Sequence, residues 1–139
     1  MRFLSIDIGD KRTGLAVGDD VLRIASPVDV LQIADVARLI EALATAVAEH
    51  EPDELVVGLP LNMDGSEGPR ARLVRDLAAK LGQRTGKRVH LFDERLTSFA
   101  AEDSFKGRNL TRGRKKERRD AMAAAVILDD FLRARSEGA

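Results

Sequence analysis

Apolar residues form a nearly continuous run near the start of the chain, at residues 2–9. Phe3, Leu4, Ile6 and Ile8 give the pattern of a central strand that is covered on both faces. Asp7 interrupts this run, and a buried carboxylate without a partner is costly, so it either meets a partner such as a metal ion or caps the following turn. Gly9 would let a backbone or a phosphate approach this carboxylate closely.

Two-residue alternation and short connections predict that two more strands follow as an antiparallel meander. We expect them at residues 13–18 and 21–25, with Pro27 ending the meander. Apolar spacing then predicts helices and buried strands in alternation. The expected helices cover residues 33–50, 69–85 and 115–135, a further one begins at Thr97 or Ser98 and runs through 99–102, and the expected strands cover 55–59 and 88–92.

A polar loop at residues 60–69 follows the strand predicted at 55–59. In open α/β sheets, ligands bind at the carboxyl ends of strands, so this loop is a candidate for substrate contact. The alternative is a tight turn that closes against the next helix.

Length and composition indicate one folded domain over residues 1–139. Hydrophobic residues make up 44% and charged residues 33%, which excludes a disordered chain. Cysteine is absent, which rules out a disulfide framework and a thiolate zinc site and suits the cytoplasm. The N-terminal apolar run is too short for a signal peptide, and we expect no association with a membrane.

Positive charge is concentrated in one segment, although the net charge is zero. Residues 106–119 hold eight basic residues and one acid, against 15 basic and 22 acidic residues in the remainder. This segment either contacts an anion, for which nucleic acid is the obvious candidate, or is a solvated loop without a partner.

Carboxylates stand at three separated places: Asp7, the pair Asp93 and Glu94 after the strand at 88–92, and Asp120 in the last predicted helix. If they converged, their repulsion would require divalent cations, and oxygen ligands suit Mg²⁺ or Mn²⁺. One or two such ions could support hydrolysis of a phosphodiester. Alternatively, Asp120 only complements its helix N-terminus or pairs with Arg119 or Lys116. Spacing alone leaves these alternatives open.

Four stretches together resemble the YqgF family, also called RuvX, over essentially the whole chain. They are DIGDKRTGLAVGD, VVGLPLNMDGSEGPRA, FDERLTSFAAE and RRDAMAAAVILDDFL. The resemblance implies a single α/β domain with a ribonuclease H-like fold, built on a five-stranded mixed sheet of order 3-2-1-4-5 with helices on both faces. It also implies a metal-dependent nuclease that matures the 5′ end of pre-16S ribosomal RNA.

The resemblance assigns roles to individual positions. Asp7, Glu94 and Asp120 match the family's acids and are implied to be catalytic and to bind Mg²⁺ or Mn²⁺, with Asp93 as the alternative to Glu94. Its basic turn and its loop after the fourth strand, which match Lys11, Arg12 and Asn62, are implied to contact nucleic acid. From the charge of the basic segment, we expect Arg112, Arg114, Lys115 and Lys116 to hold the nucleic-acid backbone.

Two other functions remain open: a Holliday junction resolvase acting as a homodimer on branched DNA, and a non-catalytic RNA-binding factor in ribosome assembly. A resolvase of the RuvC type would carry a second acid three residues after Asp120, where this chain has Ala123. We therefore expect RNA as the preferred substrate and either a monomer or a homodimer. An actin-like or sugar kinase, suggested by the glycines around Asp7, would need a second domain.

Overall fold

The computed structural model describes residues 1–96 and 112–137, with side chains for 1–95 and 121–136. Its centre is one five-stranded sheet with the strand order β3-β2-β1-β4-β5. The strands are β1 (Arg2–Ile8), β2 (Thr13–Asp19), β3 (Ala25–Leu31), β4 (Glu54–Leu59) and β5 (Arg88–Asp93). The first three pair antiparallel, and β4 and β5 run parallel to β1, so the sheet is mixed as predicted.

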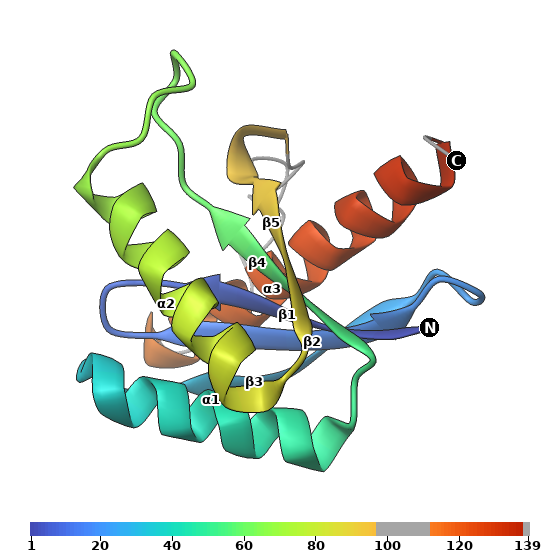
Figure 1. Cartoon of the computed structure of the whole chain (residues 1–139), viewed down its shortest axis with the longest axis horizontal. Helices are drawn as coiled ribbons and strands as arrows, with labels where there is room; N and C mark the ends of the chain where they lie inside the picture. The colour runs from blue at the N-terminus through green and yellow to red at the C-terminus, as the bar shows by residue number, and fades with distance from the viewer. Residues whose placement is uncertain (97–111, 138–139) are drawn as a thin grey trace.

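Helices cover both faces of the sheet (Figure 1). Helices α1 (Val36–His50) and α2 (Pro69–Thr85) lie on one face, α3 (Arg112–Glu137) lies on the other, and a short 3₁₀ helix, η1 (Glu94–Leu96), follows β5. None of the helices in these described ranges combines the length and the apolarity needed to cross a bilayer.

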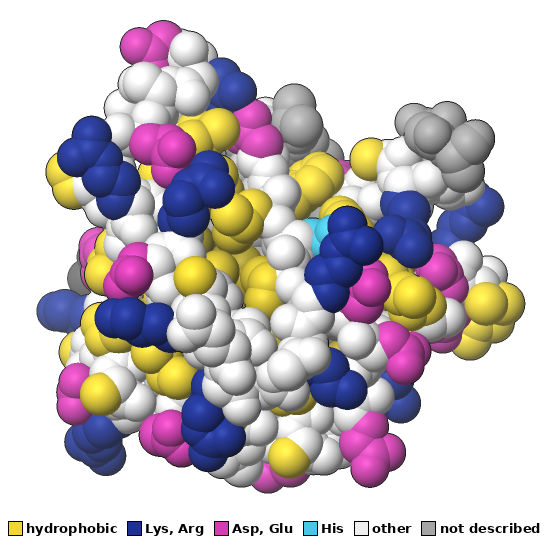
Figure 2. All heavy atoms as spheres, in the orientation of Figure 1, with side chains coloured by type: hydrophobic (Ala, Val, Ile, Leu, Met, Phe, Trp, Pro, Cys, Tyr) yellow, Lys and Arg dark blue, Asp and Glu magenta, His cyan; other side chains and the backbone are white. Residues whose placement is uncertain are grey.

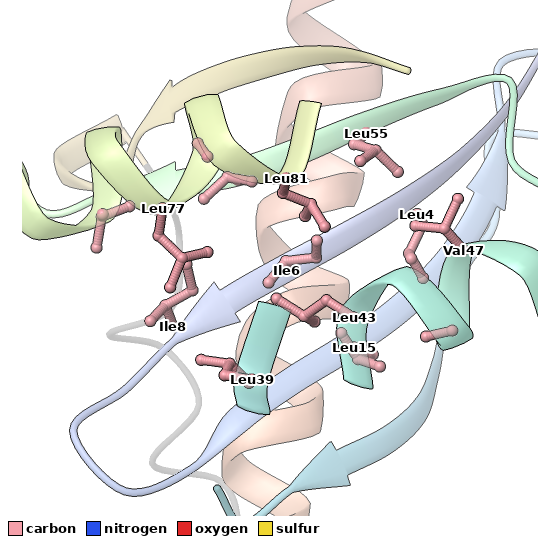
Figure 3. Packing of buried hydrophobic residues seen from close by; sticks show 14 of the residues in the cluster. Leu4, Ile6, Ile8, Leu15, Leu39, Leu43, Val47, Leu55, Leu77 and Leu81 are labelled. Carbon is pink, nitrogen blue, oxygen red and sulfur yellow. The ribbon is translucent and has the colours of Figure 1, made fainter. Parts of the chain in front are cut away.

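The main apolar core lies between the sheet and the pair α1 and α2 (Figure 3). Alternate residues of β1 point into it, together with one stripe of each helix, because a strand sends successive side chains to opposite faces. The labelled members of this core are Leu4, Ile6, Ile8, Leu15, Leu39, Leu43, Val47, Leu55, Leu77 and Leu81.

A third antiparallel strand follows as predicted, but its predicted bounds are wrong. Residues 20–22 form a turn instead, because the Asp19 carboxylate accepts hydrogen bonds from the N–H groups of Val21 (2.9 Å) and Leu22 (2.6 Å). Strand β3 begins only at Ala25 and includes Pro27. It tolerates a proline because it is an edge strand, where one side of the backbone needs no partner.

Other element bounds differ less from the prediction. Helix α1 begins at Val36 because the Asp35 side chain caps it, accepting from the Ala37 N–H at 3.2 Å. Helix α2 has both predicted ends, with Pro69 in its first turn and Gly86 as its C-cap. Helix α3 begins at Arg112, three residues before the predicted start. The helix predicted through 99–102 lies outside the described residues, as does the part of the basic segment before residue 112.

Candidate active site

Two carboxyl groups meet at the carboxyl end of the central strands. Asp7 comes from β1, and Glu94 comes from η1, directly after β5. The two groups share a hydrogen bond. Burial of Asp7, followed by that hydrogen bond and by the negative charge of Glu94, raises the pKa of Asp7 to about 8, while the nearby Arg70 charge acts in the opposite direction.

A glycine makes room for the Glu94 side chain. A Cβ atom on Gly58 of β4 would stand 2.5 Å from Glu94 Oε1 and 2.8 Å from Ile127 Cδ1 of α3. A side chain at this position would therefore displace the ends of the Glu94 and Ile127 side chains. The absence of a side chain at Gly58 thus leaves room for the Glu94 carboxyl on the face of the sheet that α3 covers.

Helix α3 runs antiparallel to β1 across this face. The buried Ser5 hydroxyl donates to the Ala124 carbonyl at 2.8 Å, and Phe3 packs edge-on against Phe131, with 5.4 Å between ring centroids. Moving toward Asp7 along β1 therefore means moving toward the N-terminus of α3. Asp120 belongs to α3 and precedes Ala124 by one helical turn, which spans about 5.4 Å, while Ser5 and Asp7 are about 6.6 Å apart along the strand.

The side chain of Asp120 itself is not among those described. Within the described part, no three His, Cys, Asp or Glu side chains form a group that could hold a metal ion. The structure thus brings together two of the three acids that the sequence singled out.

Asp93 and Glu94 are neighbours in the chain but have different partners. The Arg95 guanidinium donates to both oxygens of Asp93 at 2.7–3.1 Å, and the Arg95 N–H donates at 2.9 Å. These hydrogen bonds from Arg95 hold the pKa of Asp93 below its usual range. Asp93 is therefore held by a cation, whereas Glu94 faces Asp7.

Arg70 is a residue of this site that the sequence analysis missed. It lies in the first turn of α2, and its guanidinium donates to the Ile8 carbonyl at 2.7 Å and pairs with Asp10 at 2.9 Å. It thereby ties α2 to the end of β1 and places a positive charge near Asp7. A signal was available, because a cation at a helix N-terminus is unfavourable unless an anion is close.

Of the basic residues predicted to bind nucleic acid, only those of the β1–β2 turn have described side chains. Lys11 is exposed in the β1–β2 turn. Arg12 closes that turn, its carbonyl accepting from the Gly9 N–H at 2.8 Å, and its Nη1 atom is buried with no hydrogen-bond partner among the described residues. Arg112, Arg114, Lys115 and Lys116 belong to the first turns of α3, and their side chains are not described.

The face of the molecule formed by α1 and α2 is not a uniform cationic surface. Over α1 and α2, Lys and Arg side chains are interspersed with Asp and Glu (Figure 2). Pairs such as Arg84 with Glu41 and Lys80 with Asp76 account for part of this mixture.

The chain is similar to known proteins over nearly its whole length. A family model described as "RuvX: Holliday junction resolvase" matches residues 1–134. A protein of Anaeromyxobacter sp. (strain K) named "Putative pre-16S rRNA nuclease" is 46% identical over 132 residues, covering 95% of this chain and 96% of that protein. A protein of the same name from Myxococcus xanthus is 41% identical and covers 95% and 87%.

Solved structures agree with the fold. RuvC of T. thermophilus in complex with a Holliday junction substrate aligns with a TM-score of 0.62 at 16% identity, covering 98% of this chain and 96% of that one. The Fowlpox virus resolvase, in its complex with Holliday junction DNA, aligns with a TM-score of 0.55 at 11% identity, covering 95% and 99%. At such low identity these matches establish the ribonuclease H-like fold and nothing further.

Proposed function

The chain belongs to the RuvX family, and from this premise we propose that it is a divalent-metal-dependent nuclease that acts on a precursor of 16S ribosomal RNA. The observation that carries the proposal is the half-buried, hydrogen-bonded pair of Asp7 and Glu94 at the carboxyl ends of the strands. Two carboxyl groups held together in this way are unfavourable when both are ionised, and a cation between them removes that cost.

The residues present fit a divalent cation. Asp7 and Glu94 offer only oxygen atoms, as Mg²⁺ and Mn²⁺ prefer, and the chain has no cysteine that could supply a softer thiolate ligand. One or two ions bound by Asp7, Glu94 and Asp120 would supply charge neutralisation and an activated water to the phosphodiester. We do not include Asp93 among these ligands, because Arg95 already binds both of its oxygens.

The chain's own residues would orient the substrate. Lys11 and Arg12 lie in the turn directly after Asp7, where their charges can hold a phosphate group. Arg112, Arg114, Lys115 and Lys116 would bind the backbone from the start of α3. Asn62 fits this role less well than expected, because its amide donates to Ser66 at 3.0 Å and so helps to close its own loop.

Two arguments favour RNA over a DNA junction. The curated relatives carry the name of an rRNA nuclease. The position three residues after Asp120 is the buried Ala123, which supplies no carboxylate. The family description nevertheless favours a junction resolvase as the second candidate, and that activity would require a homodimer, whereas RNA cleavage requires only a monomer. We place the activity in the cytoplasm, in keeping with a chain that lacks cysteine.

The test compares cleavage of a precursor rRNA fragment, unstructured RNA and a four-way DNA junction, each with Mg²⁺, Mn²⁺ or chelator. Wild-type protein should cut the precursor in either metal and not in chelator. Asp7→Asn should lower the rate by at least about 100-fold, whereas Asp76→Asn, an exposed acid of α2, should not. Cutting of the junction alone would favour the resolvase, and binding of RNA without any cutting would favour a non-catalytic factor.

A further inference from the structure

The loop between β4 and α2, residues 60–68, is built as a rigid projection. The Asn62 N–H donates to the Ser66 carbonyl at 2.9 Å, and the Gly65 N–H donates back to the Asn62 carbonyl at 2.8 Å. The Asp64 carboxylate accepts from both the N–H and the hydroxyl of Ser66. The polar groups of this loop are thus largely bonded to one another.

Hydrogen bonds from Arg95 connect this loop to the chain beside the candidate active site. Its Nη1 atom donates to the Met63 carbonyl at 3.1 Å, while the rest of its guanidinium binds Asp93. The guanidinium also lies against Gly65, since a Cβ there would be 3.5 Å from Nη1. Glu94 is the residue between Asp93 and Arg95, so the loop is attached beside the carboxyl pair. Figure 1 shows the loop standing above the end of β4, near η1.

The side chain of Met63 is the feature that this arrangement leaves unexplained. It is 90% exposed, although its own carbonyl is held by Arg95. An unbranched thioether is flexible and polarizable, and it packs well against the edge and face of a ring. Apolar side chains of this kind insert beside bases and unstack them in several nucleic-acid-binding proteins.

We propose that Met63 contacts a nucleobase next to the scissile phosphate, and so selects for an unstacked base at the cleavage position. The inference rests on the proposed function, since it requires a phosphodiester at Asp7 and Glu94. The chain has no tryptophan or tyrosine with which to stack a base, which leaves this contact to an aliphatic side chain or to one of its five phenylalanines. Three of those, Phe3, Phe92 and Phe131, pack against one another on the α3 face.

The exposed apolar residues of the β2–β3 turn cannot make the same contact. Val21, Leu22 and Ile24 are exposed in the β2–β3 turn. That turn lies beside the N-terminus of β1, since Asp20 binds the Met1 amino group at 2.9 Å. It is at the opposite end of the sheet from Asp7, which makes Leu22 a suitable control.

The test uses Met63→Ala, Met63→Leu and Leu22→Ala with RNA in which single positions around the cut are made abasic. Met63→Ala should raise KM about 5- to 20-fold with a smaller change in kcat, Met63→Leu should restore most of the loss, and Leu22→Ala should match wild type. On RNA that is abasic at the contacted position, wild type and Met63→Ala should become equal. The loop should keep its shape in both Met63 variants, because its bonds to Arg95 use the backbone carbonyl.

Three outcomes separate the inference from the proposed function. If wild type cuts RNA and Met63→Ala cuts it equally well, Met63 does not touch the substrate and is free to serve a protein partner. If Met63→Ala remains weaker than wild type at every abasic position, the contact is not with a base. If wild type cuts no RNA, the proposed function fails. The inference is then tested by binding of RNA that carries 2-aminopurine, in chelator. The fluorescence of the 2-aminopurine should rise with wild type and not with Met63→Ala.

Discussion

The two faces of the sheet differ in the polarity of their side chains. On the face covered by α1 and α2, Leu4, Ile6 and Ile8 of β1 enter a continuous apolar core. On the face covered by α3, the alternate residues are Phe3, Ser5 and Asp7, so polarity increases toward the carboxyl end of the strand. Because one strand supplies both rows, the first face supports stability while the second carries the candidate chemistry.

Small residues distinguish the α3 face further. Gly58 leaves space for Glu94, and Ala124 and Ala125 let α3 approach β1 and β2 closely. The approach is close enough for the Ser5 hydroxyl to reach a helix carbonyl. Substitutions on the two faces should therefore have separable effects on stability and on activity.

The largest expected effect is on stability, from the apolar face. Leu81→Ala should lower the free energy of unfolding by about 2–5 kcal/mol, because this fully buried side chain of α2 leaves a cavity. Activity per folded molecule should be unchanged at low temperature. Denaturant titration and cleavage assays check both, with the partly exposed Leu73→Ala as the control. A loss of activity without a loss of stability would contradict the separation of the two faces.

A smaller effect is expected from Gly58→Ala, on activity. The added methyl group would displace the Glu94 carboxyl, and a displacement of about 1 Å can cost about 100-fold in rate. A double-mutant cycle checks the cause: in a Glu94→Ala background the same substitution should cost almost nothing further. Additive losses would mean that Gly58 acts through α3 rather than through Glu94.

A third expected effect is a dependence of stability on pH in metal-free protein. Asp7 has a folded pKa of about 8, above its ordinary 3.8, so the folded state holds the proton more tightly than the unfolded state. The stability that Asp7 contributes to the folded state is therefore complete below pH 3.8 and is lost as pH rises through about 8. Unfolding in chelator from pH 6 to pH 9 should show wild type losing stability relative to Asp7→Asn, and Mn²⁺ should reduce that loss. Parallel profiles would contradict a buried, protonated Asp7.

Local sequence predicted those elements whose ends carry their own signals. Pro69 and Gly86 bound α2 at both ends, so both bounds were correct. The bounds of the third strand were wrong because the apolar residues at 21–24 are typical of a strand, while the Asp19 carboxylate holds Val21 and Leu22 in a turn. The family resemblance supplied the strand order, which residue spacing alone did not determine.

The candidate site was predictable in its residue types but not in its contacts. Periodicity cannot tell which of two adjacent acids turns inward where β5 ends and η1 begins, so Asp93 and Glu94 remained alternatives. The contact from Glu94 to Asp7, which distinguishes the two acids, joins parts of the chain that only the folded sheet brings together. Arg70 was missed for the same reason, because its partners belong to the β1 end.

The most direct test of the account is a calorimetric titration of Mn²⁺ into wild type, Glu94→Gln and Asp93→Asn. The account predicts that Glu94→Gln weakens binding by at least about tenfold, while Asp93→Asn stays within about threefold of wild type. Binding that is lost in Asp93→Asn and kept in Glu94→Gln would contradict the assignment of Glu94, with Asp7, to the metal site.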